Sequence, residues 1–256
     1  MIKMIKLLLS GCCGHMGKTV TALVNSRDGY EIVAGVDLKE DSNLDYPVFA
    51  SFDEVNVNFD VIIDFSHPSV LSGLLEYTEK NHIPAVLCST GYSDEQIKKI
   101  NGASEYCALF RSANMSLGIN LLSDICEQAA KILGDNFDIE IIEAHHNLKL
   151  DAPSGTALML EKSIENGLDY KPELVYDRHD RRQKRDKKEI GMHSVRGGNI
   201  VGEHQIIFAG EDEIITFSHS ARSKTVFASG ALDAAAFMAD KKSGLYSMKD
   251  VILYQN

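Results

Sequence analysis

Short runs of apolar residues alternate with helical patterns through the first half of the chain. Continuous apolar runs are typical of strands whose two faces are both covered. Such runs lie at 4–9, 31–36, 60–65, 84–88 and 106–110. Helical patterns lie between them, at 15–26, 69–81 and 93–100. Buried strands separated by helices predict a doubly wound α/β domain built on a parallel sheet.

The pattern changes after Asn114. A long amphipathic helix is predicted at 117–133, an alternating and half-buried strand at 137–144, and a helix at 153–164. Strands at 190–195, 200–208 and 214–219 follow with short connections, which indicates a mixed or antiparallel sheet. We therefore expect a smaller α+β domain at 117–225. A helix at 225–239 and the tail are expected to rejoin the first domain, which then comprises 1–116 and 226–256.

Composition and charge narrow the classes of function. The chain has 256 residues and a formal net charge of -11, which argues against nucleic-acid binding and against docking on anionic membranes. The apolar run at 5–9 is far too short to cross a bilayer, which takes about 20 residues. Five cysteines are an odd number with no C-x-x-C pair, so neither a disulfide framework nor a thiolate metal site is expected. A cytoplasmic protein fits best.

One segment, 177–189, concentrates charge, with seven Lys or Arg and four Asp or Glu. It is either an anion-binding or nucleic-acid-binding loop, or a solvated and mobile connector. The mixed signs and the lack of interleaved aromatic residues favour the connector.

A glycine-rich turn follows the first strand and opens the first helix. Its residues are Gly11, Cys12, Cys13, Gly14, His15, Met16 and Gly17. A helix N-terminus at such a turn offers free N–H groups to the pyrophosphate of a dinucleotide. The spacing is G-x-x-G-x-x-G and not G-x-G-x-x-G, so a tight turn without any ligand is the alternative.

Polar residues at the ends of the predicted strands support a Rossmann-type, dinucleotide-binding domain. Asp37 ends the second strand, where a carboxylate can accept hydrogen bonds from ribose hydroxyls, although an ordinary loop aspartate is also common there. Small or polar residues end the next three strands. They are Ser66, Cys88, Ser89, Thr90, Ser112, Ala113, Asn114 and Met115. Because carboxyl ends of parallel strands line one crevice, we expect a nicotinamide dinucleotide at this edge.

The densest chemistry in the chain follows the strand at 137–144. His145 and His146 are neighbours and should point to opposite faces, so they should have different roles. An imidazole can give and take a proton near neutral pH, and Lys149 offers a cation to a carboxylate. The alternatives are a polar loop with two surface histidines, or a metal site formed by His145, His146 and Asp151. No second ligand cluster is spaced to complete such a metal site, and no metal is expected.

A helix start comes next, at residues 153–156. The run Pro153-Ser154-Gly155-Thr156 is expected to offer a capping hydroxyl and exposed backbone N–H groups, which form an anion pocket suited to a substrate carboxylate.

These residues carry a resemblance to a known family. The run EAHHNLKLDAPSGTA, at 143–157, closely resembles the signature of the dihydrodipicolinate reductases, also called 4-hydroxy-tetrahydrodipicolinate reductases. The resemblance spans nearly the whole chain. It includes the glycine turn, 64–66, 112–116, 196–198, 200–204 and 227–231.

The resemblance implies an oxidoreductase of lysine and diaminopimelate biosynthesis. The family reduces a cyclic dicarboxylate with NADH or NADPH after loss of water. By motif position, His145 looks like the proton donor and acceptor, and Lys149 looks like the second proton donor. His146, Lys149, Ser154, Gly155 and Thr156 look like substrate binders. The family is also typically a homotetramer formed through the second domain.

The residues after Asp37 bear on the choice of cofactor. Asp37 should accept from the ribose hydroxyls of NADH and repel the 2′-phosphate of NADPH. Some family members follow this acidic residue with an arginine, whereas this chain has Leu38 and then Lys39. Use of both cofactors is expected, with NADH preferred. Other dinucleotide-dependent imine or amino-acid dehydrogenases, and a redox-sensing dinucleotide-binding module, are the competing interpretations.

Overall fold

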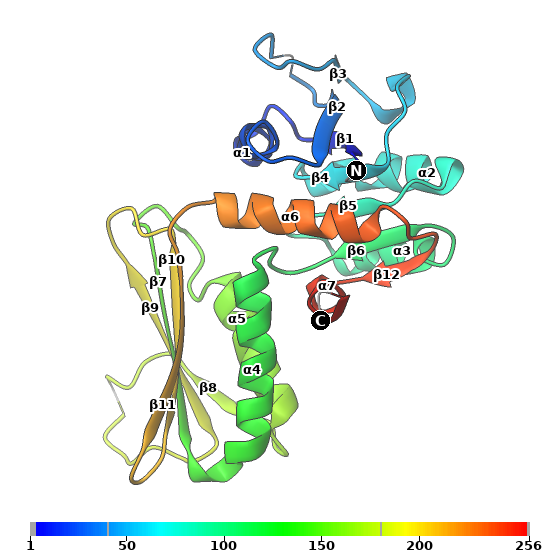
Figure 1. Ribbon diagram of the computed structural model, residues 1–256. Helices are drawn as coiled ribbons and strands as arrows, with labels where there is room; N and C mark the ends of the chain where they lie inside the picture. Colours follow the sequence, from blue (N-terminus) through cyan, green and yellow to red (C-terminus); the bar gives the residue numbers. More distant parts are fainter. Residues whose placement is uncertain (1–3, 40, 180, 255–256) are drawn as a thin grey trace. The chain divides into compact units, whose positions relative to one another are not determined.

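The structure is a computed structural model that describes residues 4–39, 41–179 and 181–254. The chain forms two compact units (Figure 1). The first unit comprises Met1–Ser116 and Lys224–Asn256, and the second comprises Leu117–Ser223. The chain thus returns to the first unit two residues earlier than the predicted boundary at 226.

The first unit is built on a seven-stranded sheet in which every pairing is parallel. Its order is β12-β6-β5-β4-β1-β2-β3. The strands are β1 (Ile5–Ser10), β2 (Tyr30–Val36), β3 (Val48–Phe49), β4 (Val61–Asp64), β5 (Ala85–Leu87), β6 (Ala108–Arg111) and β12 (Gly244–Tyr246). This is the predicted doubly wound architecture, which is therefore confirmed.

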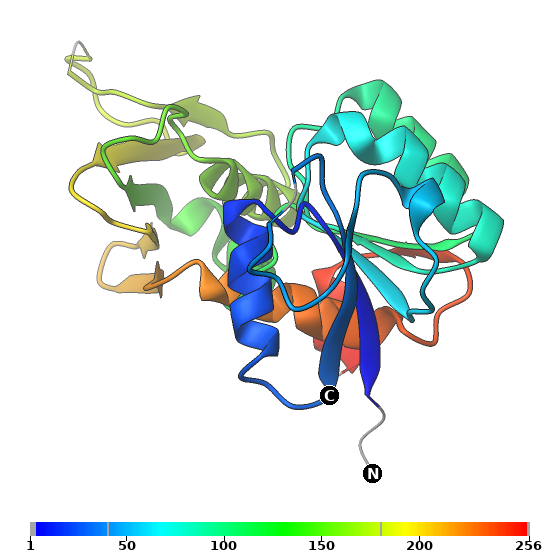
Figure 2. The same cartoon turned by 90° about the horizontal axis from the view of Figure 1, so that it is seen from above.

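Helices cover both faces of this sheet. They are α1 (His15–Val24), α2 (Leu71–Asn81), α3 (Asp94–Ala103), α6 (Thr225–Met238) and α7 (Met248–Tyr254), with short 3-10 turns at Phe52–Glu54 and Pro68–Val70. Figure 2 shows α2 and α3 on one side of the sheet, with α1 and α6 on the other. The strands are apolar on both faces because neither face meets water. Because all of these strands run parallel, their carboxyl ends lie along one edge of the sheet, where ligands bind in open α/β sheets.

The second unit holds a five-stranded mixed sheet of order β11-β10-β7-β9-β8. The strands are β7 (Asp138–His145), β8 (Glu173–Val175), β9 (Glu189–Arg196), β10 (Gly202–Ala209) and β11 (Ile214–Ala221). β10 runs antiparallel to β7 and β11, whereas β9 runs parallel to β7 and β8. The predicted mixed sheet is confirmed.

Two helices pack on one face of this second sheet. They are α4 (Leu117–Leu133) and α5 (Gly155–Gly167), with a 3-10 turn at Gly134–Asn136 after α4. Burial alternates along β7, so that Ile139, Ile141, Glu143 and His145 all face the helices. On the inward face of the sheet, the apolar core residues Ile139 and Ile141 are therefore followed directly by Glu143 and His145. The candidate site lies at this end of β7.

The elements that the sequence pattern missed are short. β3, β8 and β12 have two or three residues each, too few for a period of two to be recognised. Within the described residues, no helix is both long and apolar enough to span a membrane.

Candidate functional site

The glycine turn forms a backbone cradle that side chains would fill. Gly11 has a φ of +76°, and a Cβ built there would lie 2.7 Å from the carbonyl oxygen of Phe65. A Cβ on Gly17 would lie 2.3 Å from the carbonyl oxygen of Gly11. Helix α1 begins directly after Gly14, which offers no side chain to its first N–H groups. These groups remain available to an anion, as pyrophosphate binding requires.

A cavity of about 550 Å³ opens beside this turn. Gly11, Gly14 and Asp37 line it, together with Lys39 and Ser66. One Asp37 oxygen accepts from the N–H of Cys13 at 3.0 Å, and the other accepts from the N–H of Lys39 at 3.1 Å. The carboxylate is therefore held between the turn and the end of β2. Leu38, by contrast, is 91% exposed.

A second cavity of about 330 Å³ gathers most of the remaining predicted cofactor residues. Nine of them line it: Met16, Ser66, Cys88, Ser89, Thr90, Ser112, Ala113, Asn114 and Met115. Phe65 and Phe227 complete the lining and were not among the predicted site residues. Phe65 also borders the larger cavity, so the two cavities share a wall. The two phenylalanines lie in the family-like stretches 64–66 and 227–231, but an apolar side chain by itself does not indicate a ligand-binding role.

Asp64 organises polar residues that line the two cavities, although it was not among the predicted site residues. Its side chain is almost fully buried at the end of β4. Its Oδ1 accepts from the Ser66 hydroxyl at 2.5 Å, and its Oδ2 accepts from the Ser89 hydroxyl at 2.8 Å. A buried carboxylate that accepts two hydroxyl groups fixes the ends of β4 and β5 relative to each other.

Four predicted cofactor residues line neither cavity: Cys12, Cys13, His15 and Gly17. Among the described residues, Cys12, Cys13 and Asp37 could offer three ligand atoms to a metal ion, all within 4.8 Å of one another. Burial raises the pKa of the Cys12 thiol to about 12, and a metal needs the thiolate. The Asp37 oxygens are already engaged with backbone N–H groups. These observations give no support to a metal centre in the turn.

His145 is the last residue of β7 and is 8% exposed. The strand predicted at 137–144 therefore ends one residue too early, and His145 belongs to the strand and not to a polar loop after it, because the burial alternation of β7 continues through His145. Its Nδ1 lies 2.6 Å from an oxygen of Glu143, which has no exposed surface. Burial lowers the pKa of His145 below its ordinary value, while the Glu143 carboxylate acts in the opposite direction.

Lys149 and His146 lie in the loop that follows. The Nζ of Lys149 lies 2.9 Å from a carboxylate oxygen of Asp151, and the side chain of Lys149 is 22% exposed. The Nδ1 of His146 is buried, and among the described residues it has no hydrogen-bond partner. A buried imidazole nitrogen without a partner is costly unless a ligand or water satisfies it.

Ser154 caps helix α5 as the sequence predicts, since its hydroxyl accepts from the N–H of Ala157 at 3.2 Å. A Cβ added to Gly155 would meet nothing within 4 Å, so the first turn of α5 is open at that residue. Thr156 follows in the same turn. The structure thus brings Ser154, Gly155 and Thr156 together at one helix N-terminus in the unit that carries His145.

A second buried histidine, His204, adjoins this group and was not among the predicted site residues. Its Nε2 lies 3.2 Å from the Ser154 hydroxyl, and its ring stands edge-on to that of His145 with centroids 5.3 Å apart. Burial, reinforced by the charge of His145, lowers the pKa of His204 to about 4. Its position on the buried face of the alternating strand β10 could have indicated that His204 points inward.

Acid is therefore expected to destabilise the fold through His204. Its imidazole takes up a proton near pH 6.5 in the unfolded chain, but only near pH 4 in the folded protein. Between these values the unfolded state binds more protons, so the free energy of unfolding falls as the pH falls, by roughly 3 kcal/mol at the lower end.

Urea unfolding of the wild type and of His204→Gln at several pH values between 7 and 4 measures this effect. The variant should lose clearly less stability over the range. Some loss should remain, because burial also lowers the pKa values of His145 and His219. Parallel curves for the two proteins would contradict the assignment.

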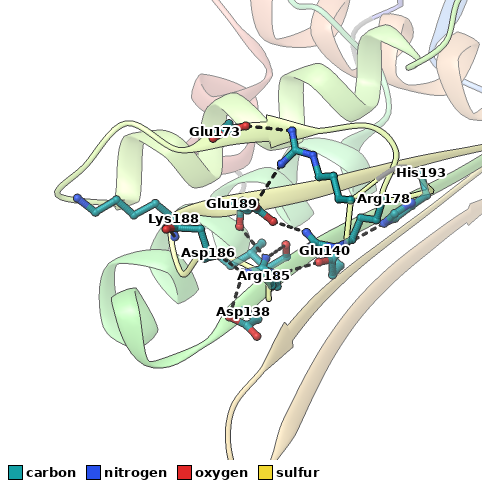
Figure 3. A network of polar contacts seen from close by, with 11 residues as sticks. Asp138, Glu140, Glu173, Arg178, Arg185, Asp186, Lys188, Glu189 and His193 are labelled. Atoms are coloured by element: carbon teal, nitrogen blue, oxygen red, sulfur yellow. Dashed lines mark hydrogen bonds and ion pairs between the residues drawn. The ribbon is translucent and has the colours of Figure 1, made fainter. Parts of the chain in front are cut away.

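The charged segment 177–189 is held by ion pairs over part of its length (Figure 3). Arg178 and Arg181 pair with the nearly buried Glu189. Arg185 contacts Asp138 at 2.9 Å and Glu140 at 3.1 Å, and it also donates to three backbone carbonyls. These three arginines are held by acidic partners and are not simply solvated. Of these partners Glu189 is buried, whereas Asp138 is half exposed.

The chain was compared with known protein families, curated proteins and solved structures. The family model described as "Dihydrodipicolinate reductase, N-terminus" matches residues 5–115, and the one described as "Dihydrodipicolinate reductase, C-terminus" matches residues 118–252.

Relatives named 4-hydroxy-tetrahydrodipicolinate reductase match over nearly the full length. The one from Clostridium novyi (strain NT) is 50% identical over 254 residues, which covers 99% of this chain and 100% of the relative. The one from Caldanaerobacter subterraneus subsp. tengcongensis is also 50% identical, over 97% of this chain and 98% of its own.

A solved structure agrees with these matches. It is a dihydrodipicolinate reductase from Paenisporosarcina sp. TG-14 with dipicolinate bound, and it aligns with a TM-score of 0.80 at 26% identity, over 96% of this chain and 99% of its own. The predicted oxidoreductase is thereby confirmed, and the chain belongs to the dihydrodipicolinate reductase family.

Proposed function

We propose that this chain reduces 4-hydroxy-tetrahydrodipicolinate to tetrahydrodipicolinate, with loss of water, in the biosynthesis of diaminopimelate and lysine. The observation that carries the proposal is the group of His145, Lys149 and the open N-terminus of α5 within one unit. Two proton donors and an anion site suit a dicarboxylate that must gain a proton while it is reduced.

The residues of the second unit divide the work as follows. His145 delivers a proton to the carbon next to the one that is reduced, and Lys149 is the second proton donor. His146 and the backbone N–H groups of Gly155 and Thr156 hold the carboxylates. Lys149 can release Asp151, which is largely exposed, when a substrate carboxylate takes its place.

The first unit fits a nicotinamide dinucleotide. The backbone around Gly11 and Gly17 leaves no room for side chains, which lets its N–H groups approach a phosphate, and Asp37 lines the larger cavity, where its carboxylate suits the adenosine ribose hydroxyls. Bound there, NADH or NADPH supplies the hydride. The polar lining of the smaller cavity, from Ser66 to Met115, suits the nicotinamide end of the same molecule. All five cysteines are free, which fits a cytoplasmic enzyme.

NADH is expected to be the better cofactor, with NADPH also accepted. Asp37 lines the larger cavity, and its charge opposes a 2′-phosphate by on the order of 1–3 kcal/mol. Lys39 lines the same cavity and offsets part of this repulsion. We expect kcat/KM for NADPH to rise in Asp37→Ala, because the repulsion disappears, and kcat/KM for NADH to fall. A wild type that clearly prefers NADPH, or a variant without any gain for NADPH, would overturn this role of Asp37.

A coupled assay tests the activity itself. The substrate is generated in place from pyruvate and aspartate semialdehyde by the preceding synthase, and oxidation of NADH or NADPH is followed by absorbance. Oxidation should depend on the presence of all components. Tight nucleotide binding without any oxidation would contradict the proposed reaction and favour a dinucleotide-binding module without catalysis.

We also place the chain in a homotetramer, as the family resemblance implies. The face of the second sheet opposite α4 and α5 supports this assembly. It carries exposed apolar side chains, among them Ile214 at 68% and Val195 at 48% exposure. Light scattering in solution measures the mass, and a mass of one chain would contradict the assembly.

A further inference from the structure

Glu143 is the most completely enclosed charged residue next to His145. Its side chain has no exposed surface, and both of its oxygens are hydrogen-bonded. Arg196 donates to it from both terminal nitrogens, at 2.8 Å and 2.7 Å, and the N–H of Ser154 donates at 3.1 Å. Buried charges are tolerated when they are paired and saturated in this way.

This pair determines which nitrogen of His145 can react. A carboxylate only accepts hydrogen bonds, so Nδ1 of His145 carries the proton in the contact with Glu143. The other nitrogen, Nε2, points toward Gly202, where a Cβ would approach it to 3.2 Å. The side chain of His145 nevertheless keeps 11% of its surface exposed, while its Nδ1 is engaged with Glu143.

The same guanidinium also holds the loop that carries Lys149. Arg196 donates from Nη2 to the backbone carbonyl of Asp151 at 2.6 Å, and the side chain of Asp151 pairs with Lys149. Glu143 in turn accepts from the N–H of Ser154, the cap of α5. One buried ion pair thus contacts the imidazole, the lysine loop and the helix N-terminus.

We propose that Glu143 and Arg196 are positioning residues that aim Nε2 of His145 at the substrate and fix it relative to Lys149 and the anion site of α5. This inference rests on the proposed function. In the proton-transfer step, the Nε2–H bond of the imidazolium breaks and a C–H bond forms at the substrate carbon. The neutral imidazole keeps its Nδ1 proton on Glu143 throughout and regains the Nε2 proton from water.

Charge-removing substitution at Glu143 is the central test. Glu143→Gln keeps the shape and an accepting oxygen but removes the charge that favours the imidazolium. We expect kcat to fall by about tenfold or more and KM for the dicarboxylate to change little. The decline of kcat/KM with rising pH should begin at lower pH than in the wild type, since the Glu143 carboxylate raises the pKa of His145 and the variant lacks it. Glu165→Gln, which breaks only the surface pair with Lys162, is the control and should retain full activity.

Arg196→Lys tests the contact between Arg196 and the loop that carries Lys149. Lysine keeps a positive charge near Glu143 but cannot reach both of its oxygens and the Asp151 carbonyl. We expect KM for the dicarboxylate to rise together with the fall in kcat, because the Lys149 loop is released. A purely structural role would lower the melting temperature and the active fraction without moving the pH profile or KM.

NMR of the imidazole nitrogens in the full-length wild type needs neither substrate nor turnover. It should show His145 protonated at Nδ1, and the titration of His145 should shift to lower pH in Glu143→Gln. A wild-type His145 protonated at Nε2, or an unshifted titration and pH profile in the variant, would overturn the proposal. Absence of turnover in the wild type would instead contradict the proposed function, and the NMR result would still decide the coupling.

Discussion

Replacement of His145 by glutamine is expected to lower kcat by about 10²-fold or more, because the proton that accompanies hydride transfer then has no positioned donor. Glutamine is preferred to alanine because His145 is buried against Glu143. Removal of that donor would leave part of a buried carboxylate unsatisfied, at a cost of about 1–3 kcal/mol. The Gln variant should fold normally and bind the cofactor normally, so that the loss lies in the chemical step.

Measurement of kcat and of stability for Lys149→Ala distinguishes a site residue in a loop from the buried His145. Lys149 lies in a loop and pairs with the largely exposed Asp151, so its removal should change the free energy of unfolding by less than about 1 kcal/mol. Activity should nevertheless fall by about 10²-fold or more. Lys162→Ala removes a comparable exposed ion pair on α5 and serves as the control. Near wild-type kcat in either the His145 or the Lys149 variant would contradict its assigned role.

The sequence predicted the fold well because local periodicity records which faces are covered. The parallel sheet was recognisable from runs such as that of β1, which is apolar on both faces. The second unit was recognisable from the strict alternation in β7. Eight of the nine predicted cofactor residues that share one cavity were predictable for a topological reason, since they follow the ends of the neighbouring parallel strands β4, β5 and β6. The ninth, Met16, lies in the first turn of α1.

What the sequence did not reveal depends on pairing between distant segments. Glu143 and Arg196 are 53 residues apart, and only the register of β7 beside β9 brings them together. The burial of His145 depends on the same register, so the sequence placed it in a loop. Arg185 likewise belongs to a charged stretch that reads as solvated until its contacts with β7 are known. Local patterns do not encode such partners.

Replacement of glycine by alanine is expected to lower the free energy of unfolding by different amounts at Gly134, Gly17 and Gly11, depending on the backbone geometry at each position. Gly134→Ala adds a Cβ at a φ of +45° with nothing within 4 Å, so it should cost only the left-handed conformation, about 1–2 kcal/mol. Gly17→Ala has an ordinary φ, but its Cβ would lie 2.3 Å from a backbone oxygen of the turn. Gly11→Ala combines both costs and should be the most destabilising of the three.

The KM for NADH is expected to differ between the variants in the turn and Gly134→Ala. Both Gly11→Ala and Gly17→Ala must displace the backbone of the turn, which we propose to bind the pyrophosphate, so we expect KM for NADH to rise about tenfold or more. Gly134→Ala, in the second unit, should leave KM for NADH unchanged. Urea unfolding and cofactor kinetics on the three variants give both quantities. Equal stability losses for Gly11→Ala and Gly134→Ala, with an unchanged KM for NADH in both, would show that the close approach of Gly11 to Phe65 neither stabilises the fold nor shapes the cofactor site.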